Sequence, residues 1–216
     1  MADRSLSARA ADIGLVVDQL GLPRFAIDAS NAAGLETFTY VACNAERVSH
    51  LVLADAHVRG PGKRDHPSLQ LLRGLAEIDW NLFTNTLALL ALGWTEEARQ
   101  WGEHIRRCMS REDYLAFVKA DWEVDLAPLL PTIATPALVC SSSRFAHVVR
   151  PDLARQLVSS LPNARLVSVR DANEKIRVVE EFLGDAPTAP LPPPIHPLQP
   201  GASAPSSSRT WRVTRR

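Results

Sequence analysis

Two kinds of apolar pattern alternate along most of the chain. Between Ile13 and Leu20 apolar residues recur every three or four positions, which predicts an amphipathic helix that ends at Gly21. Residues 48–53 instead form a nearly continuous apolar run, typical of a strand covered on both faces. The predicted elements are helices over 5–20, 31–43, 150–160 and 172–183, and strands over 24–29, 48–53, 136–140 and 164–169.

One long block interrupts this alternation. A breaker-rich loop over 59–67 is followed by a wholly helical pattern. Within it Ser110 and Asp113 have the spacing of a capping box, which predicts that a helix begins there. Strands that alternate with helices indicate a parallel sheet. We therefore expect an α/β fold with a mostly parallel sheet and a helical cap insertion at about 62–132.

Composition separates a domain from a tail. With 46% hydrophobic and 22% charged residues, the 216-residue chain can bury a core, and we assign residues 1–184 to one domain. Residues 185–216 are rich in proline and serine, which predicts a disordered, basic tail. The formal net charge is zero, and the part from Ala186 onward has four arginines and no acids, which leaves four excess negative charges on the rest. This balance gives no electrostatic reason to expect a nucleic-acid partner.

The sequence favours a reducing compartment and no membrane. Cys43, Cys108 and Cys140 are odd in number, far apart and in apolar surroundings, so we expect small buried thiols rather than disulfides. No run approaches the ~20 apolar residues of a membrane span, and charges near the N-terminus disrupt a signal-peptide pattern. We therefore expect a cytoplasmic protein. The six histidines include no pair with metal-ligand spacing, so neither a metal site nor a cofactor is predicted.

Ser30 lies in the stretch that points most directly to chemistry, residues 24–34. A short apolar strand pattern ends at this serine, which is bracketed by small residues, and passes directly into a helical pattern. This is the outline of a nucleophile elbow, in which a serine on a sharp strand-to-helix turn presents its hydroxyl above the sheet. The alternative is that the Ser30 hydroxyl caps the following helix by accepting an N–H bond.

Four stretches of the sequence together resemble the α/β-hydrolase family, and especially its bacterial subgroup that is often fused to cyclase or helix-turn-helix regulator domains. In that family such stretches mark the nucleophile strand, the next strand, the return from the cap and the last strand. The resemblance covers about residues 5–184 and implies that Ser30 attacks an ester-like small substrate to form an acyl-enzyme. The stretches are 20–26, 46–53, 125–139 and 161–167.

The chain also departs from the family pattern. It begins at the helix before the nucleophile strand, so the resemblance implies an N-terminal truncation that omits the first strands and the oxyanion loop. Asp28 and Ala32 replace the two glycines of Gly-x-Ser-x-Gly. The loop over 141–147 contains no carboxylate, and Glu174 occupies the position of the family histidine. Because a glutamate is a weak base for a serine hydroxyl, we expect a degenerate triad and impaired hydrolysis.

Alternatives to this interpretation remain open. Asp55 and His147 each follow a strand and provide a replacement triad for Ser30, since α/β sites assemble at the carboxyl ends of strands. The missing strands would expose the edge of the Ser30 strand, which favours a non-catalytic module that pairs with another chain or forms a homodimer. A third alternative is that the chain is a fragment of a longer hydrolase. Four tryptophans of the helical block either pack the cap or line an apolar pocket, namely Trp80, Trp94, Trp101 and Trp122.

Overall fold

The computed structural model describes residues 5–58, 64–142 and 151–184. The predicted tail over 185–216 and the candidate residue His147 lie outside these ranges. The described helices are α1 (Leu6–Gln19), α2 (Ala33–Asn44), α4 (Pro67–Ile78), α5 (Trp80–Leu92), α6 (Glu96–Cys108), α7 (Arg111–Trp122), α8 (Pro151–Ser160) and α9 (Ala172–Gly184), with 3-10 turns η1 (Ala45–Arg47) and η2 (Ala127–Thr132). The strands are β1 (Phe25–Ser30), β2 (Val48–Ala54), β3 (Ala137–Ser142) and β4 (Ala164–Val169).

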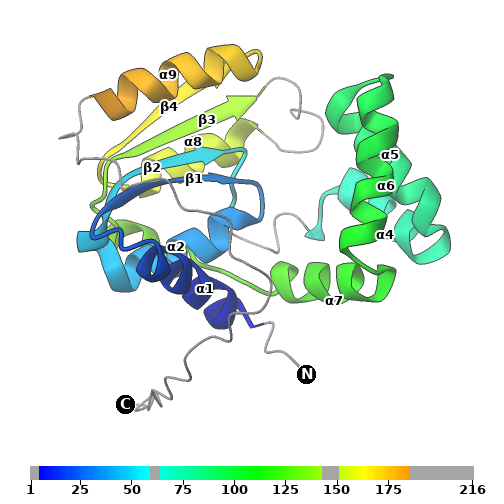
Figure 1. Ribbon diagram of the computed structural model, residues 1–216, viewed down its shortest axis with the longest axis horizontal. Coiled ribbons are helices and arrows are strands. Elements are labelled where there is room, and N and C mark those ends of the chain that lie inside the picture. Colours follow the sequence, from blue (N-terminus) through cyan, green and yellow to red (C-terminus); the bar gives the residue numbers. More distant parts are fainter. Residues whose placement is uncertain (1–4, 59–63, 143–150, 185–216) are drawn as a thin grey trace.

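The described strands form one parallel sheet in the order β1-β2-β3-β4. Helices cover both of its faces, with α1, α2 and α8 on one side and α9 on the other (Figure 1). The predicted α/β class with a mostly parallel sheet is confirmed. Within these residues β1 has a neighbour on one side only, so its outer edge ends the described sheet. Pairing of that edge with another chain or a second copy stays a prediction.

The alternating direction of the side chains along β2 explains why both faces of the sheet are covered by helices. Leu51 and Leu53 join the core shared with α1, α2 and α8, where Phe38 and Leu157 are also buried. Val52 points to the opposite face and packs in a smaller core with α9. Because successive side chains of a strand point to opposite faces, an apolar run on β2 gives apolar surface on both. The strand predicted over 48–53 is therefore buried as expected.

The helices α4 to α7 follow β2 in the chain and precede β3, as expected for a cap insertion. Helices α4, α5 and α7 pack around a core of their own, in which Trp80 stacks on Phe83 with ring centroids 5.3 Å apart and Tyr114 lies 4.6 Å from Phe83. Helix α6 packs against α5. The predicted helix start is confirmed, because Ser110 Oγ accepts a 3.1 Å hydrogen bond from the Asp113 N–H. This group of helices stands beside the sheet in Figure 1.

The cysteine prediction is only partly confirmed. Cys140 is buried in β3, but Cys43 and Cys108 are exposed, and all three are free thiols. Both exposed residues lie in the last turns of helices, α2 and α6, where the side chain points away from the core. None of the described helices combines the length and the apolar character that crossing a bilayer requires.

A substitution at Gly34, in the first turn of α2, tests how closely this helix approaches the segment after β2. A Cβ added at Gly34 would lie 2.9 Å from the Ala56 Cβ, whereas one added at Gly74 in α4 meets nothing within 4 Å. We expect Gly34→Ala to lower the unfolding free energy by about 1–3 kcal/mol through overpacking. Gly74→Ala is the matched control and should raise it by about 0.5–1 kcal/mol, since alanine favours a helix. Denaturant unfolding measures both, and a stabilised Gly34→Ala would contradict the close approach.

Candidate functional site

The carboxyl ends of the four strands meet at one edge of the sheet. Ser30 of β1 pairs in register with Ala54 of β2, which in turn pairs with Cys140 of β3. Open α/β sheets bind their ligands at this end. A cavity of about 490 Å³ lies here, which we call the edge cavity. Its lining residues are Ser30, Asn31, Ala54, Asp55, Cys140, Ser142, Val169, Arg170, Asp171, Ala172, Asn173 and Lys175.

The sharp turn between β1 and α2 is made by Asn31 rather than by Ser30. Ser30 is the last residue of the strand, and Asn31 has the left-handed φ of 53°. The Asn31 N–H still donates a 2.9 Å hydrogen bond to the Ala54 carbonyl, so the chain leaves the sheet only after this residue. Asparagine tolerates the left-handed region better than serine does. A sharp strand-to-helix turn, which we call the elbow, is present here, and it lies one residue later than the position of Ser30.

Small residues surround Asn31 on both sides. Ala29 precedes it by two positions and Ala33 follows it by two, which is the spacing of small residues around the turn residue of an elbow. Gly34 then lets α2 approach Ala56. The alternative role of Ser30 as a helix cap is wrong, because the N-cap of α2 is Ala32 and no side chain caps it.

Asp55 lies beside Ser30 in the edge cavity and fastens β2 to β3. Its backbone N–H donates to the Cys140 carbonyl, and its Oδ1 accepts from the Ser142 N–H, both at 3.0 Å. Its φ is 50°, another left-handed position that an aspartate tolerates. Burial raises the pKa of the Asp55 carboxyl, while the Ser142 N–H and the Lys175 ammonium oppose the rise. The replacement triad thus has Ser30 and Asp55 in one cavity, with His147 outside the described residues.

Glu174 is held by neighbours in the first turn of α9. Its Oε2 accepts hydrogen bonds from the Arg170 backbone N–H at 2.8 Å and from Arg170 Nε at 3.0 Å. The Arg170 side chain lowers the pKa of the Glu174 carboxyl, mainly through this side-chain bond. A carboxylate with a lowered pKa is an even weaker base, so this geometry disfavours Glu174 as a general base for Ser30.

Lys175 closes the α9 side of the edge cavity. Its Nζ lies 2.7 and 2.9 Å from the two carboxylate oxygens of Asp28 on β1. This ion pair links α9 to the strand that carries Ser30. It also offsets the negative charge that Asp28 brings close to the elbow.

A second cavity, of about 340 Å³, lies between the elbow and the cap, and we call it the cap cavity. Asn31 lines both cavities. The tryptophans divide between the predicted roles, because Trp101 and Trp122 line the cap cavity, Trp80 packs in the cap core and Trp94 is 92% exposed. The lining residues are Asn31, Ala32, Leu69, Leu72, Leu87, Leu90, Ala91, Trp101, Tyr114, Phe117, Val118, Asp121 and Trp122.

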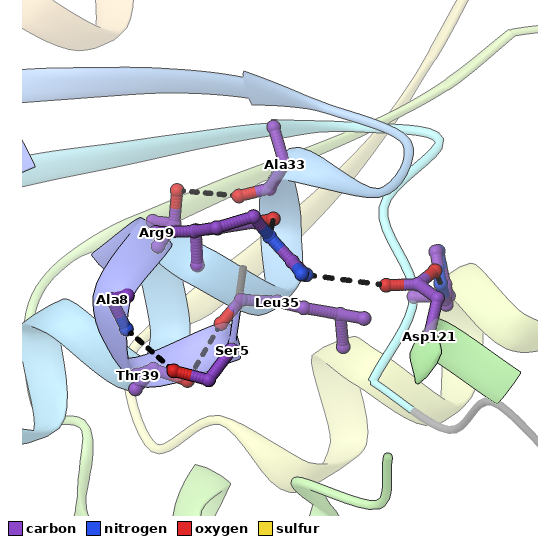
Figure 2. Close-up of polar contacts among 10 residues, drawn as sticks. Ser5, Ala8, Arg9, Ala33, Leu35, Thr39 and Asp121 are labelled. Atoms are coloured by element: carbon purple, nitrogen blue, oxygen red, sulfur yellow. Dashed lines mark hydrogen bonds and ion pairs between the residues drawn. The ribbon is translucent and has the colours of Figure 1, made fainter. Parts of the chain in front are cut away.

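A partly buried polar cluster joins the cap cavity to α1 and α2. Arg9 of α1 extends alongside α2 toward Asp121 of α7 (Figure 2). Its Nε lies 2.6 Å from Glu36 Oε1, and its Nη2 lies 3.8 Å from Asp121 Oδ1. His57, after β2, places Nε2 3.4 Å from Asp121 Oδ2. Sequence reasoning missed this cluster, since its members come from four distant segments without a shared motif.

His50 of β2 has apolar surroundings. His50 packs edge-on against Phe182 of α9, with ring centroids 4.9 Å apart. Among the residues that the structure describes, no group of three histidine, cysteine or acidic side chains has the arrangement of a metal site. The edge cavity and the cap cavity share Asn31 as a lining residue.

Comparison with known proteins identifies the fold. No protein-family model and no curated protein matches the sequence. Among solved structures, a hydrolase from Oleispira antarctica matches with a TM-score of 0.72 and 19% identity over 84% of this chain and 72% of that one. An esterase from Exiguobacterium antarcticum matches with a TM-score of 0.69 and 18% identity over 83% of this chain and 73% of that one. A bromoperoxidase from Bacillus anthracis matches with a TM-score of 0.68 and 16% identity over 84% of this chain and 75% of that one. The chain has a partial α/β-hydrolase fold.

The raised pKa of Asp55 predicts how stability depends on pH. The folded state favours the protonated carboxyl, so the contribution of Asp55 to stability is full below its unfolded pKa of about 4 and is lost as the pH rises through the raised folded value. Asp55→Asn keeps an oxygen to accept the Ser142 N–H but carries no charge. We expect this variant to have a higher melting temperature than the wild type at neutral pH, and the two melting temperatures to converge in acid.

Asp65→Asn is the control for this comparison, because Asp65 is exposed beside Arg64. Its melting temperature should follow that of the wild type at every pH. A lower melting temperature for Asp55→Asn at neutral pH would show that the ionised carboxylate stabilises the β2–β3 junction, contrary to expectation.

Proposed function

We propose that this α/β-hydrolase-fold chain binds a small, largely apolar molecule beneath its helical cap and does not hydrolyse it through a serine nucleophile. The observation that carries the proposal is the elbow, where Asn31 occupies the left-handed turn and lines both cavities. An asparagine amide has no hydroxyl to form an acyl-enzyme. It does have a donor and an acceptor with which to orient a ligand.

Several contacts argue against serine chemistry at this site. A serine needs an adjacent base that removes its proton. No imidazole is among the described residues that line the edge cavity with Ser30. Both candidate carboxylates are engaged, Asp55 with the Ser142 N–H and Glu174 with Arg170. The surroundings of Ser30 and its position before the turn both support the proposal of impaired hydrolysis.

The cap cavity favours binding. Ligand sites are typically apolar and aromatic, with a few polar groups that fix orientation, and have volumes of roughly 300–1,000 Å³. At about 340 Å³ the cap cavity is at the small end of this range. Its leucines and aromatic residues provide the apolar walls, while Asn31 and Asp121 provide the polar groups. The hydrolases and esterases with the same fold support a small organic ligand, though not a particular one.

A serine hydrolase that uses Ser30 is the second candidate, and one observation favours it. Ser30 and Asp55 line the same cavity, as the replacement triad requires. We expect a fluorophosphonate probe to leave the folded wild type unlabelled, at the level of Ser30→Ala. An active serine esterase labelled in parallel controls the probe. Labelling of the wild type that disappears in Ser30→Ala would overturn the non-hydrolytic proposal.

Binding in the cap cavity can be tested with the neutral fluorophore N-phenyl-naphthylamine. We expect its emission to rise in the presence of the wild type. Leu87→Trp should reduce the affinity about tenfold or more, because the larger side chain occupies the cavity. Leu82→Trp is the matched control, since Leu82 is on the same helix but 52% exposed. Equal binding by the wild type and Leu87→Trp would place the probe elsewhere and contradict the proposal.

A further inference from the structure

The outer edge of β1 is open within the part of the chain that the structure describes. Strand β1 ends the sheet order β1-β2-β3-β4, and it is the outermost strand on one side of the sheet in Figure 1. In a parallel sheet the N–H and C=O of one residue point to the same side, and successive residues alternate. The Asn31 N–H bonds to the Ala54 carbonyl of β2. The backbone groups of Ala26, Asp28 and Ser30 therefore point outward, where another strand can pair with them.

The two faces of β1 differ in polarity. Phe25 and Ile27 pack against the main core but remain only half-buried. On the opposite face Ala26, Asp28 and Ser30 are exposed. Because side chains alternate between the faces of a sheet, a strand beside this edge fits best if its own residues alternate in the same way. Its apolar residues should lie on the side of Ile27, and its polar or basic residues on the side of Asp28.

Residues 210–214, which we call the tail segment, have this alternation. The segment reads Thr-Trp-Arg-Val-Thr, which puts Trp211 and Val213 on one face of a strand and Arg212 on the other. Its β-branched and aromatic residues favour strands. All prolines of the chain beyond Gly184 lie between 187 and 205, so none interrupts the tail segment. The end of the chain therefore combines a proline-rich connector with a segment that has the composition of a strand.

Charge favours the β1 edge over the other edge of the described sheet. From Ala186 onward the chain has four arginines and no acids, against four excess negative charges on the rest. Asp28 on β1 has a side chain that is 49% exposed, whereas β4, at the other edge, carries the exposed Arg165. Like charges on neighbouring strands repel. A carboxylate has about four lone-pair sites, so Asp28 can accept from Arg212 as well as from Lys175.

The connector is long enough to reach the β1 edge. Helix α9 ends at Gly184, so residues 185–209 join it to the tail segment. At about 3.1 Å per residue, a proline-rich connector of this length extends to about 75 Å. The radius of gyration of a domain of this size is about 16 Å, so its whole surface lies within reach. Because both partners belong to one chain, their effective concentration is on the order of millimolar.

We propose that the tail segment adds as a strand to the outer edge of β1 of the same chain. Its backbone groups pair with the outward groups of β1. Trp211 and Val213 extend the apolar face of β1, and Arg212 lies beside Asp28. This interaction surface lies at the sheet edge and does not depend on ligand binding in the cap cavity.

Amide hydrogen exchange of the full chain, measured residue by residue by NMR, tests the strand addition. We expect the outward N–H groups of Asp28 and Ser30 to exchange at least about tenfold more slowly in the wild type than in the double variant Arg212→Pro/Val213→Pro. Proline has no N–H. Since adjacent strand residues point their N–H groups to opposite sides, the double variant removes one bond to β1 in either register.

Two controls are matched to this comparison. Ser206→Pro/Ser207→Pro adds the same two prolines outside the tail segment and should exchange like the wild type. The Asn31 N–H, which bonds to β2, should stay protected in every variant and shows that the sheet is intact. Arg212→Glu should also speed the exchange of the outward groups, whereas Arg216→Glu, which makes the same charge change beyond the tail segment, should affect them less.

Two results would overturn the proposal. One is exchange of the outward N–H groups in the wild type as fast as in the double variant. The other is protection that rises with protein concentration and is accompanied by a dimer in light scattering, because a second copy would then occupy the edge. Protection of a monomer that is independent of concentration and is lost in Arg212→Pro/Val213→Pro supports pairing within one chain.

Discussion

The chain must pass from β1 into α2 within two residues, and this constraint sets the position of everything at the carboxyl edge of the sheet. Asn31 meets it with a left-handed backbone while its N–H still bonds to β2. Ala29, Ala33 and Gly34 keep the surrounding space open, so that α2 can start against the segment after β2. Had the turn come one residue earlier, Ser30 would need a backbone conformation that serine adopts at a cost.

The cap contacts α1 through a different interaction, the partly buried cluster around Arg9. One guanidinium from α1 connects Glu36 of α2 to Asp121 of the cap, and His57 completes the contact from the segment after β2. Burying charges costs desolvation that their attraction only partly repays, so such clusters are weak sources of stability. Their geometry is specific, however. The cluster therefore fixes α7 relative to α1 and the segment after β2, and with it the α7 wall of the cap cavity.

Periodicity predicted most of the fold, because the strands and helices bury their apolar residues in the ordinary way. The nearly continuous run of β2 and the capping pair of Ser110 and Asp113 are both found as expected. The turn residue was missed because serine suggests a nucleophile, while the better signal was an asparagine centred between Ala29 and Ala33. The Arg9–Asp121 contact has no local signal at all, since it depends on how the cap folds back onto α1.

Binding and hydrolysis depend on separable parts of this fold. An acyl-enzyme pathway needs a nucleophilic side chain at the elbow turn and a base beside it, and an asparagine at the turn does not supply the nucleophile. The cap cavity is built by α4, α5, α6 and α7 and by the cluster that holds Asp121, none of which requires a nucleophile. An asparagine at the turn even adds a polar contact to the cavity. An elbow without a nucleophile at its turn is therefore compatible with the fold and with the cavity beneath the cap.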